Sequence, residues 1–297
     1  MNLTGLLTEQ PNPASDHIDA LPTSEVLAII NFEDQKVPSA VAGEIPKITE
    51  AVDRIVELIR AGGRMFYIGA GTSGRLGVLD AAECPPTFQV PPDLVQGIIA
   101  GGEAALARAT ETSEDDPDAG KSDLAERGFT EKDALVGIAS SGRTPYVLGA
   151  VEAANKLGAL TIGISCTPDS PLAHRVRIAI TPLVGPEVIA GSTRMKAGTA
   201  TKLVLNMISS TIMIRLGYVL GNLMVNVQPR NSKLRDRAMR IIASSAAVGY
   251  QRASELLLEA GDNVPVAIVM ARLSLDRSSA QARLSAAGGR ISEALKT

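Results

Sequence analysis

The chain contains 297 residues, of which 45% are hydrophobic and 21% are charged. These proportions are typical of a folded globular protein and exclude a disordered chain, and the length allows one large domain or a domain with an appendage. The net charge is −3, and only 3% of the residues are aromatic, with no tryptophan. Since nucleic-acid-binding proteins use basic patches and aromatic stacking, we expect no nucleic-acid partner.

Cysteine usage and hydropathy indicate the compartment. Cys84 and Cys166 are the two cysteines and have neither CxxC nor metal-site spacing, which is typical of a reduced, cytoplasmic protein. The first residues lack the basic and apolar regions of a signal peptide. The most apolar region, Leu203–Val227, is interrupted by polar residues and glycines, so it predicts a buried helix pair and no membrane span.

The N-terminal part, residues 1–60, precedes the first expected strand. Residues 2–22 are rich in Thr, Asn, Pro and Asp and predict an extended arm. One helix is expected to begin at Thr23-Ser24-Glu25. A second, Val41–Ala61, has apolar residues spaced three and four apart, which predicts one buried helical face.

The next stretch predicts an anion-binding turn. The apolar run Met65–Ile68 predicts a buried strand, and the glycines of Gly69-Ala-Gly-Thr-Ser-Gly74 favour a tight turn after it. Thr72 or Ser73 can then cap a helix, which the Pro85-Pro86 pair is expected to break. Backbone N–H groups and the positive end of the helix dipole would face one point, where an anion can bind.

The same turn matches the GxGxxG pattern of dinucleotide-binding proteins. That fingerprint also needs an acidic residue at the end of the second strand, where it holds a ribose. The expected second strand, Leu94–Ala100, ends instead in Gly101-Gly102. A phosphate monoester, or helix capping alone, therefore fits the turn better than a dinucleotide does.

Strands and helices alternate along the middle of the chain. This pattern predicts an α/β fold with a doubly wound, mainly parallel five-stranded sheet flanked by helices, over residues 61–230. The five strands are expected at Met65–Ile68, Leu94–Ala100, Ala134–Ala139, Leu160–Ser165 and Arg177–Thr181.

From Met195 onward the pattern is helical. A long helix is expected first, and another after Asn231. A small C-terminal helical module is predicted at 231–297, its last part forming three helices because it is interrupted at 261–265 and 288–289.

A second hydroxyl-rich turn follows the third expected strand. Ser140, Ser141 and Thr144 lie there, as Thr72 and Ser73 lie after the first strand. Turns at the carboxyl ends of parallel strands can face one crevice, so hydroxyl and N–H donors from both can bind one phosphate monoester. Helix capping alone is the alternative for each turn, but two such turns favour phosphate.

Glu83 and Glu114 are the candidate catalytic carboxylates. Proton transfer at carbon needs a carboxyl group held out of bulk water, and Glu83 lies between the first turn and a proline pair. Glu114 lies in an acidic loop that can equally be a solvated surface. That loop lacks the spacing of an EF-hand, so we expect no metal.

A third polar cluster covers Gly185–Lys202. Its cations, Arg194, Lys196 and Lys202, are suited to an acidic group of a ligand, and equally to a solvated turn. The residues alone leave both interpretations open.

These segments together resemble a known family. The Gly-Thr-Ser-Gly and Ser-Ser-Gly-Arg-Thr turns are similar to those of sugar isomerase (SIS) domains, which bind phosphosugars. Gly185–Lys202 resembles a signature shared by glucokinase regulatory protein and the N-acetylmuramic acid 6-phosphate etherases. Leu7–Lys36 and Leu79–Thr87 resemble the etherase family in particular, so the resemblance covers nearly the whole chain.

The resemblance implies site residues and a reaction. The family's phosphate-binding turns correspond to Ser73, Ser140, Ser141 and Thr144, and its two active-site glutamates to Glu83 and Glu114. The implied lyase converts N-acetylmuramic acid 6-phosphate to N-acetylglucosamine 6-phosphate and D-lactate, in amino sugar catabolism and peptidoglycan recycling. It implies no cofactor and no metal, and a cytoplasmic homodimer whose sites are shared between subunits.

Two other functions stay open at this point. A non-catalytic phosphosugar sensor would keep the serine and threonine turns without needing Glu83. An aldose–ketose isomerase on the same fold would interconvert sugar phosphates and release no lactate.

Overall fold

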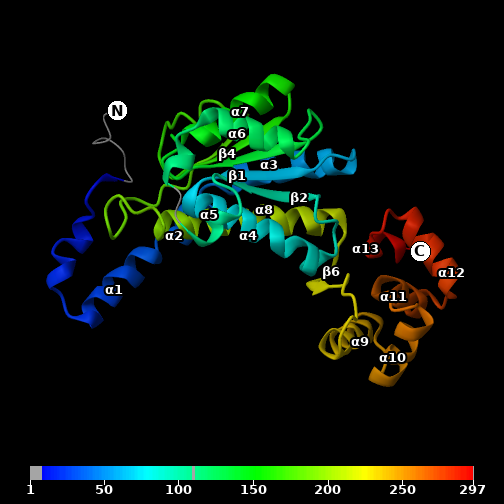
Figure 1. The fold of residues 1–297 in the computed structure, drawn as a ribbon. Coiled ribbons are helices and arrows are strands. Elements are labelled where there is room, and N and C mark those ends of the chain that lie inside the picture. The colour runs from blue at the N-terminus through cyan, green and yellow to red at the C-terminus, as the bar shows by residue number, and fades with distance from the viewer. Residues whose placement is uncertain (1–8, 109–110, 297) are drawn as a thin grey trace. The chain divides into compact units, whose positions relative to one another are not determined.

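A computed structural model describes residues 9–108 and 111–296 (Figure 1). The described chain forms two compact units. One unit contains the residues up to 82 together with 92–209, and the other contains 83–91 and the residues from 210 onward. The expected division into 1–60, 61–230 and 231–297 stays a prediction.

The first unit is built on a five-stranded parallel sheet. The strand order is β2-β1-β3-β4-β5, and every neighbouring pair is parallel, which confirms the predicted fold class. Each strand lies within one residue of its expected bounds at either end. The strands are β1 (Met65–Gly69), β2 (Val95–Ile99), β3 (Ala134–Ile138), β4 (Leu160–Ile164) and β5 (Ile178–Ile180).

Helices cover both faces of this sheet (Figure 1). Phe66 and Ile68 of β1 pack in a cluster with residues of α6 and α7, whereas the hydroxyl of Tyr67 donates to Asp80 of α4 on the opposite face. This alternation is the two-residue period of a strand buried on both sides. The helices that begin in this unit are α1 (Thr23–Asp34), α2 (Val37–Ala42), α3 (Ile45–Arg60), α4 (Gly71–Phe88), α5 (Ala104–Ala107), α6 (Pro117–Glu126), α7 (Pro145–Leu157) and α8 (Lys196–Leu216).

The N-terminal part differs from the expectation in two ways. The expected arm lies partly outside the described residues, and its described part is not simply extended, because Pro13–Ser15 and Ile18–Ala20 form short 3-10 helices. The helix expected at Val41–Ala61 is α3, which begins later than expected, at Ile45, because the first residues of the expected range belong to the end of a separate helix, α2. Pro46 stands in the first turn of α3, where a missing N–H costs nothing, so a new helix begins there.

The helix after the first turn does not break at the proline pair. α4 continues to Phe88 with Pro85 and Pro86 inside it. The prolines remove two donors, but a proline carbonyl still accepts: the N–H of Gln89 donates to the carbonyl of Pro85 at 2.9 Å. The proline φ near −65° is also compatible with a helix, so the last turn of α4 persists.

The second unit contains a hairpin where a helix was expected. α8 ends at Leu216, and β6 (Val219–Leu220) pairs antiparallel with β7 (Leu223–Met224). The prediction of a helix pair in Leu203–Val227 is therefore wrong. Gly217 and Gly221 have positive φ angles, +92° and +60°, so one ends the helix and the other begins a two-residue hairpin turn.

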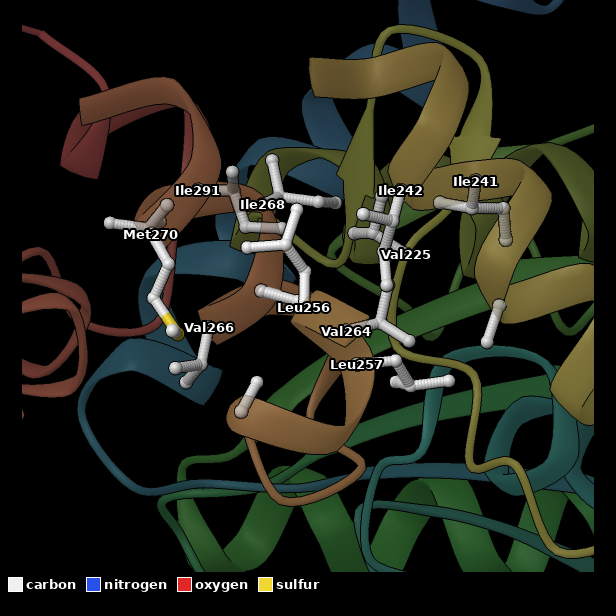
Figure 2. Packing of buried hydrophobic residues seen from close by; sticks show 14 of the residues in the cluster. Val225, Ile241, Ile242, Leu256, Leu257, Val264, Val266, Ile268, Met270 and Ile291 are labelled. Atoms are coloured by element: carbon white, nitrogen blue, oxygen red, sulfur yellow. The ribbon is translucent and has the colours of Figure 1, made fainter. Parts of the chain in front are cut away.

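A helical core completes this unit (Figure 2). Its buried cluster includes Val225, Ile242, Leu257 and Ile268. Instead of three helices, four follow α9, because Asp276 caps a helix that the sequence pattern did not separate. No helix of the described residues is long and apolar enough to cross a membrane. The helices are α9 (Ser232–Ala246), α10 (Tyr250–Glu259), α11 (Val264–Leu273), α12 (Arg277–Ala286) and α13 (Ile291–Ala294).

Candidate functional site

The two hydroxyl-rich turns lie at neighbouring strand ends. Gly69, the last residue of β1, pairs with Ile138, the last residue of β3, and each turn begins directly after its strand. The chain passes from β1 to β2 on one side and reaches β3 on the other side of β1. The turns therefore flank the topological switch point of the sheet, where open α/β folds bind ligands.

The glycines of the first turn serve two purposes. A Cβ on Gly69 would lie 2.7 Å from the backbone nitrogen of Gly74, and one on Gly74 would lie 2.6 Å from the carbonyl oxygen of Gly69. Gly71 has a φ of +51°. Close packing of strand on helix and a left-handed residue thus account for the GxGxxG pattern without a dinucleotide.

Thr72 and Ser73 lie inside the first turn of α4. The helix begins at Gly71, so neither residue stands before it as the expected cap. The hydroxyls of both residues make no hydrogen bond to another described residue, although Ser73 is only 8% exposed. These hydroxyls are therefore available to a ligand.

The segment that follows β4 supports the backbone of the second turn through hydrogen bonds and close packing. The carbonyl of Ser140 accepts a hydrogen bond from the N–H of Cys166 at 2.8 Å and from the hydroxyl of Thr167 at 3.3 Å. Gly142 has a φ of +65°, and a Cβ there would lie 2.3 Å from the Ser170 side chain. These contacts fix the backbone of the turn while leaving its hydroxyl face to other partners.

The hydroxyls of the second turn are mostly unbonded as well. Ser141 Oγ accepts a long hydrogen bond, 3.4 Å, from the N–H of Arg143. Thr144 occupies the cap position of α7, but its side chain makes no capping hydrogen bond. Ser140 Oγ has no partner among the described residues. Helix capping alone therefore does not explain the hydroxyls of this turn, and their binding of phosphate stays a prediction.

A buried carboxylate anchors α4. Asp80 is 6% exposed and accepts hydrogen bonds from Tyr67 of β1 at 2.9 Å and from Asn206 and Ser209 of α8 at 2.7 and 3.1 Å. Burial of a carboxylate needs such donors. Asp80 was missed from the sequence, because its partners lie far away along the chain.

The two candidate carboxylates are both exposed in the single chain. Glu83 lies on α4, one turn after Asp80. Glu114 ends a short 3-10 helix, Glu111–Glu114, which contacts α7 just after the second turn. The catalytic roles of both residues stay predictions.

A cavity of about 650 Å³ lies beside β2 and α6. Its lining includes Ser113 and Asp116, on either side of Glu114 in the chain, but not the hydroxyls of the two turns. Asp123, Glu126 and Glu103 also line it. Its four acidic residues outnumber its one arginine, Arg127, and would repel an anion, which makes this cavity a poor phosphate site.

The third polar cluster is not a solvated turn. Lys196 is 1% exposed, and its ammonium donates to Glu33 at 2.6 Å. Glu187 is equally buried and accepts from the backbone N–H groups of Lys196 and Ala197, both at 2.9 Å. Glu187 thereby caps the N-terminus of α8, where a negative charge is favoured. Lys196 is therefore not available to a ligand.

The same network ties the N-terminal segment to this loop. The side-chain amide of Asn12 donates to Glu33 and to the carbonyl of Pro186, both at 3.0 Å. Burial alone would raise the pKa of Glu33, but hydrogen bonds from Lys196, Lys36 and Asn12 outweigh it and lower the pKa to about 2. A Cβ on Gly198 would lie 3.5 Å from Thr72, so this network supports the helix turn beside the first hydroxyl turn.

Within the described part of the chain, no group of three His, Cys, Asp or Glu side chains is placed to hold a metal ion.

Comparison with known proteins identifies the family. The glucokinase regulatory protein N-terminal SIS domain matches residues 47–155, and the SIS domain matches 124–210. An N-acetylmuramic acid 6-phosphate etherase of Pasteurella multocida is 53% identical over 290 residues, covering 98% of this chain and 96% of the relative. The chain belongs to the N-acetylmuramic acid 6-phosphate etherase family.

Other relatives support the same assignment. Members of the family from Caldanaerobacter subterraneus and Aliivibrio fischeri are 52% and 51% identical, each with nearly the full length of both chains aligned. A phosphoheptose isomerase of Neisseria gonorrhoeae shares the fold, with a TM-score of 0.50 and 18% identity, over 64% of this chain and 97% of the isomerase.

The Glu33 network predicts a measurable pH dependence. The pKa of Glu33 is depressed from 4.5 to about 2 in the folded chain. Its contribution to stability is therefore complete above pH 4.5 and lost as the pH falls toward 2. Glu33→Gln leaves Lys196 buried without a counter-ion, which is expected to cost about 3–5 kcal/mol of unfolding free energy at pH 7. It should also flatten the acid limb of the stability profile.

Denaturant unfolding followed by circular dichroism from pH 2 to 7 measures both effects. Glu50→Gln is the control, because the Lys47–Glu50 pair is exposed and its loss should change stability by less than about 1 kcal/mol. Equal stability of the two variants at pH 7 would contradict the role given to Glu33.

Proposed function

We propose that this chain cleaves the D-lactyl ether of N-acetylmuramic acid 6-phosphate, giving N-acetylglucosamine 6-phosphate and D-lactate. The observation that carries the proposal is a pair of hydroxyl turns without internal partners at the switch point, in a chain that is about half identical to named etherases over its whole length. The substrate is thus a phosphosugar, and the reaction is a carbon–oxygen lyase reaction.

An elimination reaction explains how the unreactive ether bond at C3 of the sugar can be broken. In the open-chain sugar, the aldehyde at C1 acidifies the hydrogen on C2. A base removes this proton, the C3–O bond breaks, and lactate leaves with the ether oxygen. Water then adds to C3 of the unsaturated aldehyde. Each step needs a positioned proton donor or acceptor, and each such group contributes roughly 10²–10⁴-fold.

Binding of the substrate's phosphate positions C2 and C3 of the sugar for the reaction. Ser73, Ser140, Ser141 and Thr144, with Thr72 beside them, donate hydrogen bonds to the phosphate, and the first turns of α4 and α7 add backbone N–H groups and dipoles. Binding energy from this non-reacting end can be used to orient the sugar for proton transfer.

Glu83 is proposed as the main acid and base, and Glu114 as the group that assists the leaving oxygen or the incoming water. This division follows the match of the Ala-Ala-Glu-Cys and Ser-Glu-Asp segments to the family. The sensor and isomerase alternatives are not favoured, since the relatives that match nearly the full chain are named etherases.

Ser73 and Glu83 stand ten residues apart on α4, which corresponds to about 15 Å along a helix axis. The C2 and C3 carbons of the substrate are only a few bonds from its phosphate. We therefore propose a homodimer in which Glu83 acts on a substrate held by the turns of the second copy. Leu79, one turn before Glu83 on the same helix face, is 54% exposed, as an interface residue would be in the isolated chain.

A cytoplasmic location is proposed with this function. Cys84 and Cys166 are both buried thiols that form no disulfide, which suits a reducing compartment.

Isotope labelling tests the reaction. Purified protein should release D-lactate from N-acetylmuramic acid 6-phosphate. In H₂¹⁸O the label should enter the C3 hydroxyl of the sugar product and not the lactate, because the C3–O bond is the one that breaks. In D₂O the C2 position should gain deuterium. Labelled lactate would contradict the elimination route, and absence of lactate would contradict the assignment.

Glutamate substitution tests the carboxylates. Glu83→Gln keeps size and polarity but removes the base, so kcat for lactate release should fall by about 10²–10⁴-fold while the circular dichroism spectrum stays unchanged. Glu114→Gln should have a separate, smaller effect. Glu57→Gln, an exposed glutamate of α3, is the matched control and should keep full activity. Near-normal activity of Glu83→Gln would exclude it as the base.

Complementation tests the shared site. Ser73→Asp should abolish phosphate binding by charge repulsion, and Glu83→Gln should abolish proton transfer, so each protein alone is inactive. Co-expressed, they form mixed dimers in which about a quarter of all sites contain both normal residues, if each site takes Glu83 from the second copy. Lactate release should recover to roughly that fraction. No recovery in a protein that sediments as a dimer would place both residues in one chain's site.

A further inference from the structure

The site residues proposed so far leave a charge imbalance. Near neutral pH the substrate carries a phosphate and a carboxylate. Its proposed partners are five neutral hydroxyl residues and two glutamates, and the whole chain has a net charge of −3. The hydroxyls and the helix N-termini are assigned to the phosphate, so the carboxylate is left without a compensating partner, and burial of an unpaired charge is costly.

Most cations near the turns already have partners. Lys196 is neutralised by Glu33 at 2.6 Å. Arg75, in the first turn of α4, donates to the carbonyls of Leu106 and Arg108, both at 3.2 Å. Arg194 and Lys202 are exposed and keep their solvation.

Arg143 is different. It lies in the second hydroxyl turn, between Gly142 and Thr144, and its side chain is partly buried. Its Nε is fully buried and has no hydrogen-bond partner, and its guanidinium forms no ion pair with any described residue. A guanidinium nitrogen that is buried without a hydrogen-bond partner is costly, and such a group in a native structure calls for a partner such as a ligand.

We propose that Arg143 binds the carboxylate of the substrate's lactyl group; this inference rests on the proposed function. The phosphate already has hydroxyl donors and the N-terminal turns of two helices, whereas none of the residues assigned to the site so far offers a donor to the carboxylate. A guanidinium presents parallel N–H groups that match a carboxylate in a two-point contact. Arg143 would thus distinguish a lactyl ether from an ordinary hexose phosphate.

Two ligands separate the carboxylate from the phosphate. N-acetylmuramic acid 6-phosphate carries both anions, and the product N-acetylglucosamine 6-phosphate carries only the phosphate. In Arg143→Met, kcat/KM for lactate release should fall by about 10–100-fold, the range expected for a charge-assisted contact. The inhibition constant of N-acetylglucosamine 6-phosphate should change by less than about threefold. Arg143→Lys should recover only part of the loss, because an ammonium lacks the fork.

Thermal unfolding without ligand distinguishes recognition from a structural role. Since Arg143 has no internal partner, Arg143→Met should keep or raise the Tm of the free protein, while Arg64→Met, which removes the partner of buried Asp133, should lower it. A lowered Tm for Arg143→Met, equal weakening of both ligands, or unchanged kinetics would each overturn the proposal.

Failure of the proposed etherase function can be distinguished from failure of the Arg143 proposal. If the wild-type protein releases no lactate, that function is wrong, and calorimetric binding of the same two phosphosugars to wild type and Arg143→Met still tests the carboxylate contact. Loss confined to the lactyl-bearing ligand supports it, and any other pattern overturns it.

Discussion

The hydroxyl turns depend on the pairing of β1 with β3. These strands are distant in sequence, yet Gly69 and Ile138 end in register, and each is followed at once by a serine-containing turn. Because both strands are parallel and buried, their carboxyl ends must open on the same edge of the sheet. A register shift of one residue would reverse the side chains of β3 and separate the turns.

The support behind the turns is polar and buried. Asp80 joins α4 to β1 and α8, and the Glu33–Lys196 pair with Glu187 fixes the first turn of α8 next to Thr72. Buried networks of this kind add little net stability over apolar packing, but they are costly to leave half satisfied. Their effect is therefore to hold one arrangement of the helices, so that hydroxyl groups without internal partners stay in place for a ligand.

Buried polar side chains that have partners within the chain differ in meaning from those that have none, and the second kind indicates a ligand site. Glu187, Lys196 and Asp80 would attract attention as buried charges, but each has its donors or acceptors within the chain. The Nε of Arg143 and the hydroxyls of Thr72, Ser73, Ser140 and Thr144 lack such partners among the described residues. A polar group that the fold leaves unsatisfied at a switch point is better evidence of a ligand than a shifted pKa or a nearby cavity, because nothing in the folded chain compensates its desolvation.

The sequence by itself determined the five strands and the hydroxyl side chains of the two turns. Apolar runs located all five strands, and the serines and threonines after the first and third strands predict turns that bind phosphate. Where sequence patterns misled, backbone geometry was the reason. α4 continues through Pro85 and Pro86, and the carbonyl of Pro85 still accepts a hydrogen bond from Gln89, whereas glycines of positive φ turn the chain after Leu216 into a hairpin. Only the tertiary structure decided that Lys196 is neutralised by Glu33, that Asp80 anchors α4, and that Arg143 has no partner. Each of these facts concerns residues far apart along the chain, and local sequence carries no record of which distant charges burial will bring together.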